Sequence, residues 1–68
     1  MMGWATDIKG KLDSWRSDAV AAVEIIDAAL PELEEGSPEK VGAQDIKAEI
    51  NLIISLIDAA LLIVTPFA

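Results

Sequence analysis

The segment from Ile46 to Val64 is apolar around most of the circumference of a helix, and no other feature constrains the fold as strongly. Apart from Glu49, its polar side chains mark a narrow edge, at Lys47, Asn51, Ser55 and Asp58, with Thr65 just beyond the segment. A helix of this kind is normally covered by protein or lipid on nearly every side. The remainder of a 68-residue chain is too small to cover it. The sequence therefore predicts that the protein associates with a partner.

The composition argues against most kinds of chemistry. The chain has no cysteine, histidine or tyrosine, which removes thiolate ligands, the commonest general base and the usual phenolic acid. Its formal charge is −7 with only five basic residues, so a nucleic-acid partner is not expected. We predict no enzymatic activity, no cofactor and no metal site.

Glutamates cluster in the middle of the chain and are the only dense set of potential metal ligands. They are Glu32, Glu34, Glu35 and Glu39. The segment lacks the Asp/Asn alternation and the fixed glycine of an EF-hand loop, and bundle-type di-iron sites need a Glu-x-x-His motif that this chain does not contain. We interpret the cluster as a solvated acidic turn.

Apolar residues recur at steps of three and four in the first half, which predicts a helix over residues 6–30. Thr6 or Asp7 is a candidate cap at its start, since a short oxygen-bearing side chain accepts hydrogen bonds from the unpaired N–H groups there. Pro31 lacks an N–H group and should end the helix.

An acidic turn containing proline and glycine is predicted over residues 31–42, followed by a second helix over residues 43–65. Ser37 with the proline after it is typical of a helix start, but Gly42 weakens that start, so the regular helix is expected from residue 43. The prediction is a single all-α domain over residues 1–68, an antiparallel two-helix hairpin completed by oligomerisation or by docking on a larger assembly.

The two halves of the chain resemble each other. Residues 24–30 match residues 55–61 at an offset of 31, and the same offset carries Arg16 onto Lys47. Each half therefore has a basic residue followed eleven residues later by an acid, which is close to three helical turns.

Folding the chain about Ser37 makes residues whose numbers sum to 74 face each other. Arg16 then meets Asp58, and Asp27 meets Lys47, so one register satisfies both ion pairs. The same pairs would also form between the chains of a two-fold dimer. We interpret Asp58 as a residue that fixes helix register; the alternative is a buried acid in proton transfer or a pore lining.

Large apolar side chains on both helices are the candidate interface residues. They are Trp4, Ile8, Leu12, Trp15, Ile50, Leu52, Ile53, Leu56, Ile57, Leu62 and Ile63. We interpret the two tryptophans as packing residues of a helix–helix interface, with anchoring of an in-plane helix at a membrane surface as the alternative.

Residues 50–68 are also long enough to be considered as a membrane span. Their eleven Leu, Ile, Val and Phe side chains contribute roughly −3 to −6 kcal/mol to insertion, while Asp58 costs about 2.5–3.5 kcal/mol. With the remaining polar groups the sum is near zero. A soluble or particle-associated protein is therefore favoured over a membrane protein.

The function expected from the sequence is that of a structural or assembly subunit. Its second helix would be buried against copies of itself or against a larger particle, such as a virion or a filament. The alternative is a small membrane-active protein of the holin or pore type, with residues 48–65 in the bilayer. A third interpretation is a helical adaptor that binds the groove of one partner without self-association.

Overall fold

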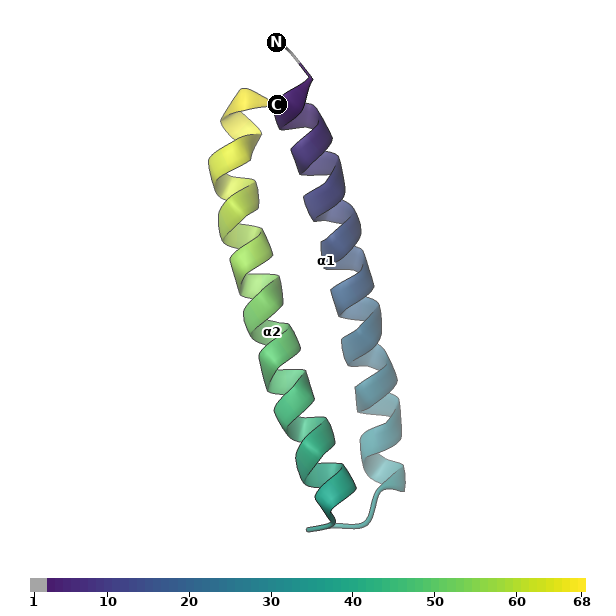
Figure 1. The fold of residues 1–68 in the computed structure, drawn as a ribbon. Coiled ribbons are helices and arrows are strands. Elements are labelled where there is room, and N and C mark those ends of the chain that lie inside the picture. The colour runs from purple at the N-terminus through teal and green to yellow at the C-terminus, as the bar shows by residue number, and fades with distance from the viewer. Residues whose placement is uncertain (1–2) are drawn as a thin grey trace.

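The computed structural model describes residues 3–68, which form the predicted antiparallel hairpin of two long helices (Figure 1). Helix α1 spans Trp4–Ala29 and helix α2 spans Pro38–Val64. A short 3-10 helix follows each of them, η1 at Leu30–Glu32 and η2 at Thr65–Phe67. The all-α hairpin predicted from the sequence is confirmed. Residues 1 and 2 of the predicted domain lie outside the described part of the chain.

Helix α1 begins two residues earlier than predicted, and neither candidate cap holds its start. Gly3 is the N-cap residue, and no side chain caps this end. Thr6 and Asp7 lie inside the helix, where the Asp7 N–H donates to the Gly3 carbonyl at 2.9 Å. The cap prediction was wrong because the helix continues back to Trp4, so the backbone of Gly3 supplies the first acceptor. At the other end the regular helix stops at Ala29, two residues before the proline, as a 3-10 turn takes over.

Helix α2 begins at Pro38, five residues earlier than predicted, and the connecting turn shrinks to residues 33–37. The Ser37 hydroxyl accepts from the Lys40 N–H at 3.2 Å, which satisfies one of the orphan donors at the helix start. Gly42 is accommodated within the helix. Glycine costs about 1 kcal/mol relative to alanine inside a helix. The helix still begins before Gly42, because Ser37 caps its first turn and the fixed φ of Pro38 suits the first helical position.

Gly36 enables the reversal between the helices. It has a φ of +75°, a backbone conformation that side-chain-bearing L-residues rarely adopt. This glycine therefore forms the tight corner of the hairpin.

The molecule is an elongated hairpin of 53 × 15 × 12 Å, and the start of α1 lies beside the end of α2 at one extremity (Figure 1). Its core is a single line of contact between the helices. Ala5 and Leu12 of α1 are buried against Ile57 and Val64 of α2. Towards the turn the line continues through half-buried residues, among them Ala19, Ile26 and Ile50. Two helices alone leave most of their circumference in solvent.

Candidate interaction surface

Two ion pairs connect the helices, both in the register that the sequence predicts. Arg16 Nε donates to Asp58 Oδ1 at 2.7 Å, and Lys47 Nζ donates to Asp27 Oδ1 at 2.6 Å. Both pairs form within one chain. Hydrogen bonding and charge attraction from Asp58 raise the pKa of the Arg16 guanidinium. All four side chains retain between 35% and 49% of their exposure, so the pairs specify register more than they stabilise the fold.

These ion pairs lie on one side of the contact line. Arg16 follows the buried Leu12 by four residues and Trp15 follows it by three, so at about 100° per residue the two side chains flank the contact line on opposite sides. The same argument applies to α2. Ile53 precedes the buried Ile57 by four residues, whereas Lys47 precedes the half-buried Ile50 by three, so these two side chains also lie on opposite sides of the contact line. The hairpin therefore has an ion-paired side and an opposite side.

Exposed apolar side chains cover the opposite side, and they come from both helices. The ring centroids of Trp4 and Phe67 lie 6.2 Å apart, which joins the helices at the terminal end of this surface. Trp15 on α1 is 56% exposed and Leu56 on α2 is 70% exposed. We refer to this surface as the apolar face, and its large members are Trp4, Ile8, Trp15, Ile25, Ile46, Ile53, Leu56, Ile63 and Phe67.

The predicted interface residues separate into three groups. Leu12 and Ile57 are buried in the hairpin itself, and Ile50 is half-buried. Trp4, Ile8, Trp15, Ile53, Leu56 and Ile63 belong to the apolar face, and Leu52 is exposed on the adjoining outer side of α2. Leu62 differs from the others because it lines a shallow groove with Asp58, on the ion-paired side.

Sequence reasoning missed Ala5 and Phe67. Ala5 is the most buried residue of the hairpin at 2% exposure, although its small side chain gave no apolar signal. Its position seven residues before Leu12 was the available clue. Phe67 follows Pro66, where the helix was expected to end, but η2 carries the chain one more turn and brings the ring to Trp4.

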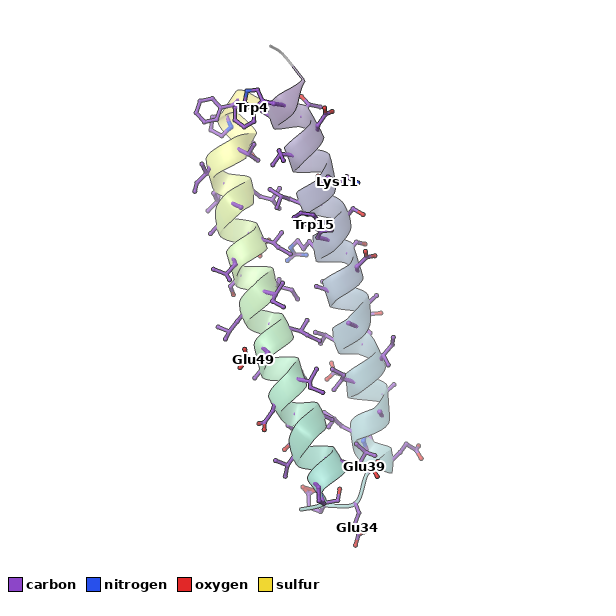
Figure 2. The ribbon with its side chains drawn as sticks, viewed as in Figure 1. Trp4, Lys11, Trp15, Glu34, Glu39 and Glu49 are labelled. Atoms are coloured by element: carbon purple, nitrogen blue, oxygen red, sulfur yellow. The ribbon has the colours of Figure 1, made fainter. Side chains whose placement is uncertain are left out.

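Negative charge is concentrated at the turn end of the hairpin. Glu34 and Glu39 project there, while Trp4 lies at the far end beside the end of α2 (Figure 2). Residues 21–53 carry eight acids and two bases, a formal charge of −6, and the rest of the chain carries −1. Within residues 3–68 no group of three or more acidic side chains is placed to hold a metal ion.

The segment Pro38–Phe67 is long and apolar enough to cross a membrane. Only 11% of its most apolar stretch of 18 residues is buried in the hairpin. A core helix of a soluble protein passes the same test of length and composition but is mostly buried. The apolar surface of α2 is therefore left uncovered by its own chain. No protein-family model matches the sequence, and no significant similarity is found to a curated protein or to a solved structure.

Proposed function

We propose that this protein is a non-enzymatic structural subunit that assembles by burying its apolar face, either against copies of itself or against a larger assembly. One observation carries the proposal: large exposed apolar side chains of both helices gather on one side of the hairpin, while the interhelical ion pairs occupy the other. An apolar surface with contributions from two elements is typical of a site that another protein covers.

The energetic scale supports assembly. Full burial of a large apolar side chain contributes roughly 1.5–3 kcal/mol. Trp15, Ile53, Leu56 and Phe67 each retain half or more of their exposure, so covering these four adds roughly 3–6 kcal/mol for each copy before association costs. Their aromatic members are of the type that dominates protein interfaces.

A membrane-active protein is the second candidate function, favoured by the length and composition of α2. In that state α2 would leave α1, because the outer surface of α1 carries charged residues along its length. The Arg16–Asp58 pair would break, and a central carboxylate in the bilayer costs about 2.5–3.5 kcal/mol on the insertion scale. The closed hairpin keeps this pair and favours association in water.

Sedimentation velocity in detergent-free buffer, combined with flotation on vesicles of neutral or anionic phospholipid, separates the two candidates. The assembly proposal predicts a discrete oligomer at micromolar concentration that stays at the bottom of the flotation gradient. A protein that requires detergent and floats with vesicles would support membrane activity instead. A monomer that neither associates nor floats would overturn self-assembly and membrane activity, and only docking on a larger assembly would remain.

A further inference from the structure

We propose that the apolar face binds a second copy of this chain in a head-to-tail orientation, so that the turn end of one hairpin lies over the terminal end of the other. This inference rests on the proposed assembly function and names its partner and geometry. The product is a four-helix arrangement in which α1 packs on α1 and α2 packs on α2, both antiparallel.

The size of the face fits a dimer. The hairpin is 53 Å long and 15 Å wide, so one face approaches the roughly 800 Å² per partner that a standard protein interface buries. A second copy has the same length and an apolar face of its own. It therefore covers the whole strip, whereas a shorter partner would leave part of it exposed.

Charge selects the orientation. The turn half of the hairpin carries −6 and the terminal half carries −1. A parallel pair would bring the two strongly acidic halves together, and like charges in apposition disfavour association. The head-to-tail pair places each acidic half over the half that contains Lys9, Lys11 and Arg16.

The positions of the large side chains agree with this geometry. The two ion pairs fix a register in which residue 20 of α1 lies opposite residue 54 of α2, so a two-fold axis at the middle of the hairpin passes near these positions. Trp15 and Ile25 lie five residues on either side of residue 20, which brings Trp15 of one copy level with Ile25 of the other. Ile25 is 71% exposed, and nothing in the single hairpin accounts for an isoleucine there.

Distances between spin labels on the two copies test the orientation. The chain has no cysteine, so a single Glu34→Cys or Thr6→Cys substitution gives one labelling site at the turn end or at the terminal end. Both positions are exposed. Pulsed electron resonance then measures the distance between the labels of a dimer, with circular dichroism as the check of folding for each variant.

When both copies carry the same substitution, the head-to-tail dimer predicts about 40 Å between the two labels. This distance follows from 1.5 Å of rise per residue on either side of the two-fold axis. A mixed dimer, with Glu34→Cys on one copy and Thr6→Cys on the other, should give roughly 10–25 Å, one to two helix diameters. A short distance between two Glu34→Cys labels would overturn the orientation while leaving the assembly function in place. Absence of any dimer at the labelling concentration, with both variants folded, would overturn the inference together with self-assembly.

Discussion

The guanidinium of Arg16 lies against the carboxylate of Asp58, forty-two residues further along the chain, with Nε 2.7 Å from Oδ1 and Nη2 3.4 Å from Oδ2. Eleven residues separate Arg16 from Asp27, and eleven separate Lys47 from Asp58, so the second pair forms three turns away in the same register. A shift of one helical turn between the helices would break both pairs at once.

The register between α1 and α2 depends on the signs of these charges. Exchanging the two charges of the Asp27–Lys47 pair tests this dependence. Asp27→Lys or Lys47→Asp alone should lower the free energy of unfolding by about 0.2–1 kcal/mol, since each single change places like charges together at a partly exposed site. The double variant Asp27→Lys/Lys47→Asp should recover most of that loss in urea denaturation. Simple addition of the two losses would contradict a direct interaction between these side chains.

The two glycines near the turn should respond to alanine with opposite signs. Gly36 has a φ of +75°, so Gly36→Ala should destabilise the hairpin by about 1–2 kcal/mol. Gly42 lies inside α2 and a β-carbon there meets nothing within 4 Å, so Gly42→Ala should stabilise it by about 0.5–1 kcal/mol. Thermal melting of the two variants and the unmodified chain, at one protein concentration, measures both changes in stability. Equal effects would contradict the turn geometry.

The cap of α2 is expected to contribute measurably. Ser37→Ala removes the hydroxyl that accepts from the Lys40 N–H, and such a loss typically costs about 1 kcal/mol. Ser55→Ala is the matched control, because Ser55 is exposed within the same helix and alanine is the better helix former. Urea denaturation should show a loss for the first variant only. A loss for Ser55→Ala of similar size would indicate that the cap is not the cause.

The thin core makes the hairpin sensitive to loss of a single large side chain. Leu12 retains 8% exposure, and Leu12→Ala should cost about 2–4 kcal/mol, enough to unfold much of a chain this small. Leu62 is 79% exposed, and Leu62→Ala should have little effect on the free energy of unfolding. Circular dichroism at 222 nm against temperature distinguishes them. Comparable stability of the two variants would contradict the assignment of the core.

Much of the architecture follows from local signals in the sequence. The three- and four-residue spacing of apolar side chains specifies two helices, and the matched charges at Arg16, Asp27, Lys47 and Asp58 specify how they face. The helix starts were predicted less well. Backbone hydrogen bonding and the Ser37 cap outweigh the low helix propensity of Gly42, and propensity is a weak guide where a cap is present.

The division of the apolar residues between core and surface was not readable from periodicity alone. Trp15 and Leu12 lie on one broad apolar face of α1, and only the position of α2 decides that Leu12 is buried and Trp15 is exposed. Leu62 was grouped with the interface residues because α2 is apolar around most of its circumference. Leu62 follows Asp58 by four residues and so lies beside it on α2, and the Arg16–Asp58 pair makes that side the ion-paired one.

The central claim is that the apolar face, and not apolar surface in general, drives assembly. Sedimentation velocity of the unmodified chain, Ile53→Glu and Leu62→Glu tests it directly, because one substitution places a charge on the apolar face and the other places it on the ion-paired side. We predict that the unmodified chain and Leu62→Glu sediment as the same oligomer and that Ile53→Glu sediments as a folded monomer. A monomeric unmodified chain at tens of micromolar would contradict self-assembly, and identical behaviour of the two variants would contradict the role of the apolar face in it.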